Sequence, residues 1–135
     1  MEFLQDEIVP ISKAREKFFG TSGRMVCPCP ATVAALLNGL PQGKVITFDR
    51  LRQRLAEQAH VEAACPVTTQ KALKAIAQAE TPGAPYWRVV KKNGEMMSFL
   101  PGGATSQAER LAQEGFPLDR TGRIPKIKPL ETSRV

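Results

Sequence analysis

Three cysteines and one histidine are the residues of this chain best suited to bind a metal or act as nucleophiles. Together they could supply the four soft ligands of a structural zinc site: Cys27, Cys29, His60 and Cys65. A proline follows Cys27 and Cys29, only one residue separates them, and His60 and Cys65 lack the paired spacing of known zinc fingers. We therefore expect no metal ion, and three reduced cysteines that are buried as small apolar side chains.

Basic side chains are the second group of residues that bears on the function of the chain. The 135-residue chain has 19 Lys and Arg against 13 Asp and Glu, which gives a formal net charge of +6. Such a balance favours an anionic partner, and DNA or RNA is the natural candidate. The basic residues of interest fall in three stretches: Arg50, Arg52 and Arg54; Lys71 and Lys74; Lys91 and Lys92.

Three helices are expected to position these residues. Apolar side chains at helical spacing predict a helix over 31–40, which Pro41-Gln42-Gly43 ends. Thr47 can cap a second helix that runs to about Ala59, and Thr68 or Thr69 can cap a third over 70–79. A short turn between two such helices, with lysines and hydroxyls near the start of the second, is typical of a helix-turn-helix.

Short strands and a last helix are expected to follow. Residues 88–90 and 95–99 read as two strands, and Asn93-Gly94 is a strong signal for a hairpin turn between them. After the loop Pro101-Gly102-Gly103, a capping box of Ser106 and Glu109 predicts a helix that ends at Gly115. The expected fold class is mainly α with a small β-hairpin, arranged as a winged helix-turn-helix.

The two ends of the chain fall outside this pattern. Residues 1–30 are interpreted as an N-terminal extension with a short helix that Ser12 caps and Gly20 ends. Residues 31–116 are expected to form one domain, and the basic, proline-containing residues 117–135 a disordered tail. We see no signal peptide and no apolar run near the ~18 residues that cross a bilayer. We expect a cytoplasmic monomer with no membrane partner, associated with the nucleoid if the source is bacterial.

Several short sequence blocks occur in a fixed order between residues 31 and 116. The most specific are Gly43-Lys44-Val45-Ile46-Thr47-Phe48 and Pro85-Tyr86-Trp87-Arg88-Val89-Val90, followed by Asn93-Gly94, Pro101-Gly102-Gly103 and Glu109 to Gly115. This order resembles the C-terminal domain of the O6-alkylguanine-DNA alkyltransferases. The resemblance implies a winged helix-turn-helix of the alkyltransferase type.

The resemblance also implies that the chain does not transfer alkyl groups. In the active family, a cysteine nucleophile followed by a histidine base stands where this chain has Tyr86 and Trp87. A phenol, with a pKa near ~10, is a poor nucleophile towards an alkyl carbon at neutral pH. The chain is closest in type to the alkyltransferase-like proteins, which lack the acceptor cysteine and bind damaged DNA without repairing it. It diverges from them because Trp87 also replaces the histidine.

Two sets of site residues follow from the resemblance. Residues expected to contact double-stranded DNA, with the third helix in a groove, are Phe48, Arg50, Arg52, Thr68, Thr69, Gln70, Lys71, Lys74, Lys91 and Lys92. Residues expected to line a pocket for an altered or extruded base, O6-alkylguanine above all, are Tyr86, Trp87, Arg88, Pro101, Gly102 and Gly103. No cofactor is implied. The family's intercalating arginine falls at Thr69 or Gln70, which argues against efficient base flipping, and Glu114 is expected to have a structural role.

Three functions remain open from the sequence. The favoured one is a non-enzymatic DNA-binding protein linked to repair, with repair proteins as further partners. A second is an enzyme that acts on DNA, through alkyl transfer relocated to Cys65 at a helix N-terminus or through base excision. A third is a regulatory or interaction domain that has kept the fold but lost the DNA surface.

Overall fold

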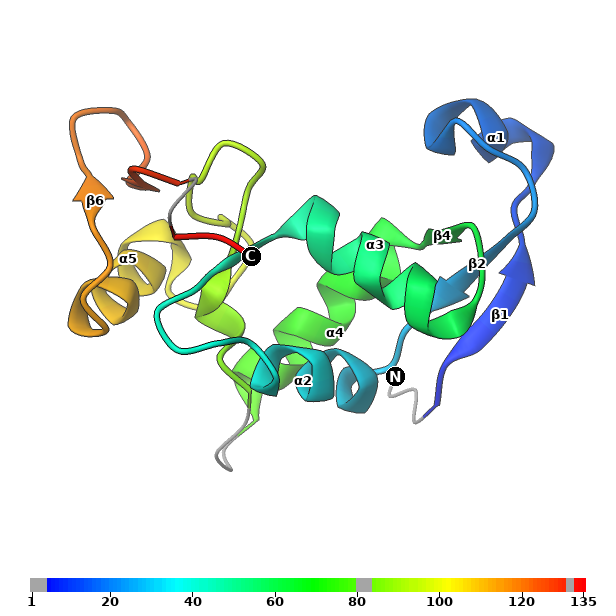
Figure 1. The fold of residues 1–135 in the computed structure, drawn as a ribbon, viewed down its shortest axis with the longest axis horizontal. Helices are drawn as coiled ribbons and strands as arrows, with labels where there is room; N and C mark the ends of the chain where they lie inside the picture. The colour runs from blue at the N-terminus through cyan, green and yellow to red at the C-terminus, as the bar shows by residue number, and fades with distance from the viewer. Residues whose placement is uncertain (1–4, 80–83, 131–132) are drawn as a thin grey trace.

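Three helices form the centre of the molecule: α2 (Pro30–Asn38), α3 (Phe48–Ala59) and α4 (Pro66–Gln78). Figure 1 shows them in the computed structural model, which describes residues 5–79, 84–130 and 133–135. The N-terminal elements lie at one end of this centre, and α5 (Gly103–Gln113) lies with the C-terminal strands at the other. None of the helices in these ranges combines the length and the apolar character needed to cross a bilayer.

The first two central helices begin and end close to where the sequence predicts. Thr47 precedes α3, and its Oγ1 accepts a hydrogen bond from the Arg50 N–H at 3.2 Å, which is the predicted cap. His60 ends the helix in the left-handed conformation, with φ of 56°. Leu51 and Leu55 face inward one turn apart, as their spacing requires.

The start of α4 differs from the prediction. The helix begins at Pro66 and Cys65 is its N-cap residue, so the prediction of a cap at Thr68 or Thr69 is wrong. Proline suits the first turn because the N–H that it lacks would have no partner inside the helix. Thr69 instead lies inside the helix, where its hydroxyl donates to the Cys65 carbonyl at 2.7 Å.

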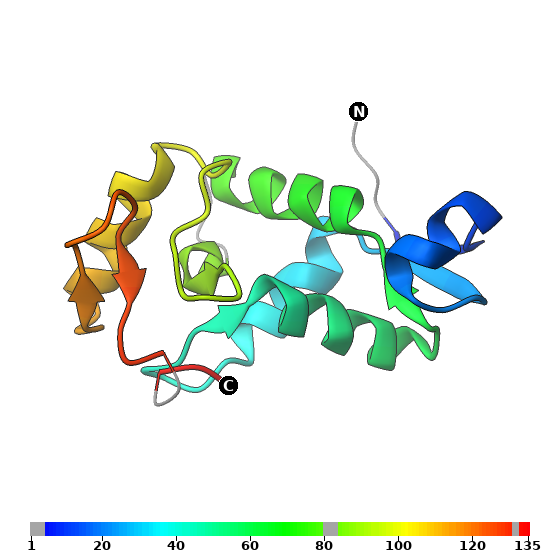
Figure 2. The ribbon, with the colours of Figure 1, turned by 90° about the horizontal axis from the view of Figure 1, so that it is seen from above.

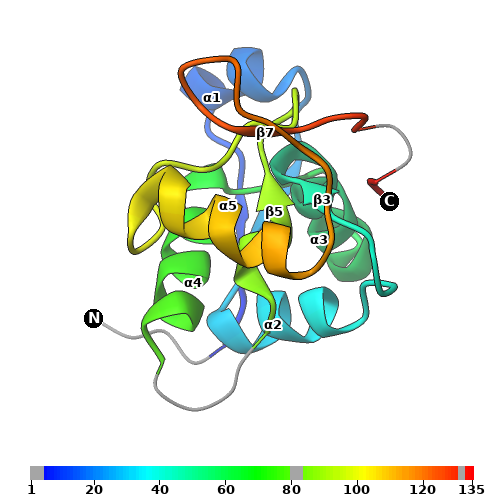
Figure 3. The same ribbon diagram turned by 90° about the vertical axis from the view of Figure 1, so that its left-hand side faces the viewer.

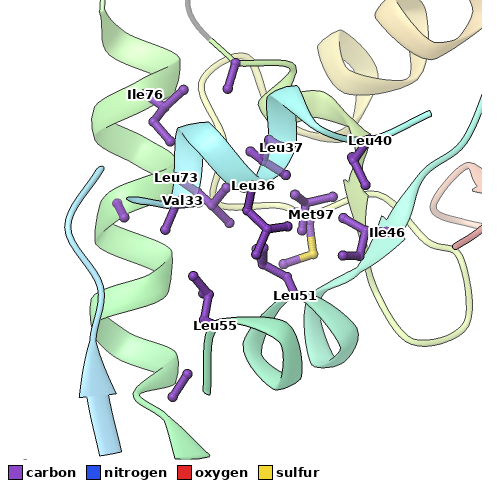
Figure 4. Packing of buried hydrophobic residues seen from close by; sticks show 14 of the residues in the cluster. Val33, Leu36, Leu37, Leu40, Ile46, Leu51, Leu55, Leu73, Ile76 and Met97 are labelled. Carbon is purple, nitrogen blue, oxygen red and sulfur yellow. The ribbon is translucent and has the colours of Figure 1, made fainter. Parts of the chain in front are cut away.

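Aliphatic side chains from all three central helices meet in one core. Figure 4 shows Leu37 of α2, Leu51 of α3 and Leu73 of α4 packed against each other together with Met97. The three leucines are completely buried. Each such side chain contributes about 1.5–3 kcal/mol through the apolar surface that it removes from water. This core fixes the position of α4 relative to α3.

A three-stranded sheet joins the N-terminal extension to the turn of the helix-turn-helix. Its strands are ordered β1 (Glu7–Pro10), β2 (Arg24–Cys27) and β4 (Ala63–Ala64). β1 and β2 are antiparallel, whereas β2 and β4 are parallel, with Val26 opposite Ala64. The predicted short helix is present between β1 and β2 as α1 (Lys13–Phe19), which Gly20 ends. Ser12 occupies its N-cap position, but its hydroxyl accepts no capping hydrogen bond.

The expected hairpin is replaced by pairing with distant segments. β5 (Val89–Val90) pairs in parallel with β3 (Ile46–Thr47), so only the first of the two expected strands forms. The turn is present, because the Gly94 N–H donates to the Lys91 carbonyl at 2.8 Å. Residues 95–99 are not a strand: the Met96 N–H donates to Pro125, and Glu95 bridges to Lys126. One local bond remains, from the Lys91 N–H to the Glu95 carbonyl at 2.8 Å, and the C-terminal segment provides the further partners of Gly94 and Met96.

The C-terminal residues fold back onto the molecule. α5 begins at Gly103 with Gly102 as its N-cap, four residues before Ser106, so the predicted capping box of Ser106 and Glu109 is wrong. β6 (Leu118–Asp119) and β7 (Lys126–Ile127) form an antiparallel pair, visible beside α5 in Figure 2. The expectation of a disordered tail is also wrong for the described residues, because Ile127 is buried in a second apolar cluster with Met96 and Leu111.

Candidate nucleic-acid interface

One face of α4 carries exposed lysines. Val67, Lys71, Lys74 and Gln78 recur at helical spacing along this face, and all four are exposed. The Lys74 ammonium lies 5.8 Å from the centroid of the Phe99 ring, in the loop that leads to Pro101. The two predicted lysines therefore share a surface that reaches towards the glycine loop.

The other predicted contacts on α4 are less available. Thr69 is completely buried and its hydroxyl is engaged with the Cys65 carbonyl, so its predicted role as a DNA contact is wrong. The Thr68 hydroxyl interacts with the thiols of Cys27 and Cys65. Gln70 is half-buried. The accessible charge of α4 is that of Lys71 and Lys74.

The predicted basic contacts on α3 are partly engaged within the protein. The Arg52 Nε donates to the Ala64 carbonyl at 3.0 Å, and its guanidinium lies 5.8 Å from the centroid of the Phe19 ring. Burial lowers the pKa of Arg52, although the side chain stays charged. Arg50 is 34% exposed and forms a 3.9 Å ion pair with Glu57, a contact of little energetic weight. Phe48 is half-buried against the main core.

The two adjacent aromatic residues lie in a single 3-10 turn, η1 (Tyr86–Arg88), which follows Pro85. Their rings meet edge to face, with centroids 5.1 Å apart. Arg110 of α5 covers both, since its guanidinium carbon lies 4.8 Å from the Trp87 centroid and 5.6 Å from that of Tyr86. Figure 3 shows α5 crossing in front of β5 and the turn that precedes it. The Trp87 Nε1 is buried and has no hydrogen-bond partner among the described residues.

A buried glutamine holds this turn in place. Gln107 of α5 donates from its amide nitrogen to the carbonyls of Trp87, at 2.8 Å, and Val89, at 2.6 Å. Its amide oxygen accepts the Met97 N–H at 2.7 Å. The side chain is only 2% exposed, so all of these groups would lack partners without it. Gln107 therefore joins η1, β5 and the segment before the glycine loop.

An ion pair makes a second connection between η1 and α5. Arg88 and Glu114 form two parallel hydrogen bonds, from Nε to Oε1 at 3.0 Å and from Nη2 to Oε2 at 3.1 Å. The bidentate geometry is the strong form of this contact. Arg88, predicted to line the base pocket, thus has its guanidinium held by Glu114, and Glu114 has the structural role expected of it.

The remaining predicted residues lie in two exposed turns. Gly102 and Gly103 have φ of 81° and 69°, values that favour glycine, and they lead into α5 directly after the exposed Pro101. Lys91 and Lys92 belong to the turn that packs against β7, where a side chain at Gly94 would come within 2.9 Å of the Ile127 carbonyl oxygen. Among the described residues, neither lysine forms a hydrogen bond or ion pair with α4.

The soft ligands considered for zinc do not converge in the described ranges, where no group of three or more potential metal-binding side chains is found. All three cysteines are free thiols. Cys65 is 5% exposed and faces Cys27 and Thr68. An alkyl acceptor must reach the alkylated atom of a base, so this burial argues against relocated alkyl transfer to Cys65.

Sequence reasoning missed two residues of the aromatic site, Arg110 and Gln107. They lie three residues apart on α5, and Glu114 follows four residues after Arg110, so all three share one helical face. That spacing was a usable signal. It did not indicate what the face packs against, because only the tertiary structure brings α5 onto η1.

The described residues adopt a helix-turn-helix fold of the alkyltransferase type. Two solved structures share the fold: S. pombe ATL in complex with DNA, with a TM-score of 0.62 and 20% identity, and S. pombe Atl1 in complex with damaged DNA containing O6-carboxymethylguanine, with a TM-score of 0.57 and 21% identity. Each match covers 78% of this chain and 93% of the other. No protein-family model and no curated protein matches the chain. The resemblance inferred from the sequence is thus confirmed at the level of the fold, with wide divergence in sequence.

Proposed function

We propose that this chain is a DNA-binding protein that recognises alkylated or otherwise altered bases and acts in DNA repair without transferring the alkyl group. The observation that carries the proposal is the shared fold with ATL proteins that were solved on DNA, one of them on DNA containing O6-carboxymethylguanine. The replacement of the acceptor cysteine by Tyr86 supports the absence of alkyl transfer.

The α4 face supports contact with the DNA backbone. Lys71 and Lys74 are exposed one turn apart and can meet phosphates if this face lies against a groove. Two such contacts supply affinity and register but no base specificity. Selectivity for an altered base must therefore come from another part of the surface.

The aromatic turn, η1, supports selectivity for an altered base. Tyr86 and Trp87 offer ring faces on which a base can stack, an interaction worth ~1–3 kcal/mol. The buried Trp87 Nε1 is a donor without a partner in the described part of the chain, and an acceptor on a base would reach it only once the covering side chains move. Arg110 covers both rings, and a stacked base must displace it.

A binding panel with three DNA ligands tests the proposed function. Plain duplex, single strand and a duplex with one O6-alkylguanine would be compared by fluorescence anisotropy at two salt concentrations. We expect duplex binding that weakens with salt, tighter binding to the lesion, and no mass increase of the protein after incubation with the alkylated duplex. Failure to bind duplex DNA, or an affinity independent of salt, would contradict DNA binding. Transfer of the alkyl group would contradict the non-enzymatic role.

A further inference from the structure

Cys27 and Cys65 lie opposite each other at the ends of two adjacent parallel strands. The register pairs Val26 with Ala64, and Cys27 and Cys65 are the next residues along β2 and beyond β4. The Cys65 N–H donates to the Val26 carbonyl at 2.9 Å, which continues the ladder to this position. Adjacent strands are about 4.8 Å apart, within the range of roughly 4.4–6.8 Å between the Cα atoms of a disulfide.

The two thiols interact but have different environments. Burial raises the pKa of Cys65, but hydrogen bonds from the Thr68 hydroxyl and from the N–H groups of Thr68 and Val67, together with the charge of Arg15, outweigh this effect and leave the pKa lowered. Burial and the neighbouring Cys65 raise the pKa of Cys27, against a hydrogen bond from Thr68. Cys65 therefore forms a thiolate more readily than Cys27 does. Cys27 is the thiol that can attack the Cys65 sulfur once that sulfur is oxidised.

The exposure of Cys27 and the position of the third cysteine also favour a reaction between Cys27 and Cys65. Cys27 is half-buried, so this edge of the sheet is open to a small solute, whereas Cys65 is 5% exposed. The third thiol, Cys29, is buried elsewhere, where its sulfur contacts the Thr32 hydroxyl at 3.4 Å. Cys29 is therefore an internal control, with which the reactivity of Cys27 and Cys65 can be compared.

We propose that Cys27 and Cys65 form a peroxide-sensitive dithiol that closes to an intramolecular disulfide. The Cys65 thiolate attacks one oxygen of hydrogen peroxide, which leaves a sulfenic acid on Cys65 and releases hydroxide. The Cys27 thiol then attacks the Cys65 sulfur, forms the S–S bond and displaces hydroxide, which leaves as water with the thiol proton. Two thiols are oxidised and one peroxide is reduced to two waters.

Closure would constrain the start of α4. Cys65 is the N-cap residue of this 13-residue helix, and its side chain makes no capping hydrogen bond in the reduced protein. In the disulfide the helix start is covalently tied to β2. Neither the bond nor its formation depends on whether α4 binds DNA.

The test uses the full-length reduced chain and a slight molar excess of hydrogen peroxide. We expect intact-mass analysis to show a loss of about 2 Da, the two thiol hydrogens, which a reductant reverses. Digestion without reduction should yield a peptide pair that joins Cys27 to Cys65. Unchanged mass, or a bond that involves Cys29, would overturn the proposal.

Two variants separate the steps. Cys29→Ser should retain the full mass loss. Cys27→Ser should instead hold Cys65 as a sulfenic acid, which a dimedone-type reagent traps. Circular dichroism of each variant before oxidation confirms that it is folded. Trapping at Cys27 in Cys65→Ser, with none at Cys65 in Cys27→Ser, would overturn the assignment of Cys65 as the attacking thiol.

Discussion

The guanidinium of Arg110 lies over the Trp87 ring at 4.8 Å from its centroid and reaches the neighbouring Tyr86 ring at 5.6 Å. An exposed cation–π contact of this kind is worth about 0.5–1 kcal/mol. Any base that stacks on these rings competes with Arg110 for them. The aromatic site is therefore covered by a side chain that must move before the site can be used.

Arg110→Ala should raise selectivity for the altered base. The variant loses one positive charge, which weakens plain and alkylated duplex alike, but only stacking on the rings gains from the removal of the competing cation. The ratio of the two affinities should therefore rise about two- to fivefold. Arg120→Ala, an exposed arginine with the same change of charge, should leave the ratio unchanged. An unchanged or lower ratio in Arg110→Ala would contradict stacking at Tyr86 and Trp87.

Lys71→Glu with Lys74→Glu should weaken duplex binding by roughly tenfold or more at low salt. Each phosphate contact contributes about −0.9 to the slope of log K against log salt, so loss of both should make the slope shallower by about 1.8. A salt titration by anisotropy measures both quantities. Lys13→Glu with Lys17→Glu on α1 gives the same change of charge on exposed residues away from α4. Equal losses in the two double variants would indicate a non-specific effect of net charge.

The sequence predicted those parts of the fold that depend on local signals. Thr47 caps α3 as expected because a cap needs only a hydroxyl and the next turn of backbone. The expected strand over 95–99 failed because Met96 and Glu95 pair with Pro125 and Lys126, about thirty residues further on. Propensity and turn chemistry do not reveal which distant segment offers a better partner.

In the candidate site, too, local signals placed some residues correctly and failed where contacts join distant elements. Helical periodicity was enough to place Lys71 and Lys74 on the outer face of α4. It did not reveal that Arg52 would donate to Ala64, nor that Arg110 would cover the aromatic turn, because both contacts join elements that only tertiary packing brings together. Thr69 was misplaced for a related reason. Because α4 begins at Pro66, about one turn earlier in the sequence than predicted, Thr69 lies inside the helix and is buried.

The pH dependence of Cys65 alkylation should show directly that the pKa of this thiol is lowered. In a Cys27→Ser, Cys29→Ser variant, alkylation reports on Cys65 alone, and only the thiolate reacts. Because the hydrogen bonds from Thr68 and Val67 and the charge of Arg15 lower the pKa, the midpoint of rate against pH should fall below the ordinary value of 9.0. Arg15→Ala should move the midpoint upward. A midpoint at or above 9.0 in the parent variant would contradict the stabilised thiolate.

Glu114→Gln should destabilise the protein modestly. The substitution removes the charge from a bidentate pair in which the side chains are 16% and 26% exposed, and we expect a loss of about 1 kcal/mol in the free energy of unfolding. Urea denaturation measures it. In a double-mutant cycle with Arg88→Met, the second substitution should cost less once the first is present. Strict additivity would show that the pair contributes nothing to stability.

Gln107→Leu should cost far more, although it replaces a polar residue by an apolar one of similar size in the core. The change leaves the Met97 N–H and the Trp87 and Val89 carbonyls without their partner in a buried region. Each group that is left unsatisfied costs about 1–3 kcal/mol, so we expect a loss of at least 3 kcal/mol in the free energy of unfolding.

Gln113→Leu, at an exposed position of the same helix, is the matched control and should change stability by less than about 0.5 kcal/mol. Trp87 is the sole tryptophan of the chain, so its fluorescence reports on the turn that Gln107 holds. We expect the emission of folded Gln107→Leu to shift relative to the parent, because η1 loses its connection to α5. A stable variant with unchanged emission would show that packing alone positions the aromatic pair.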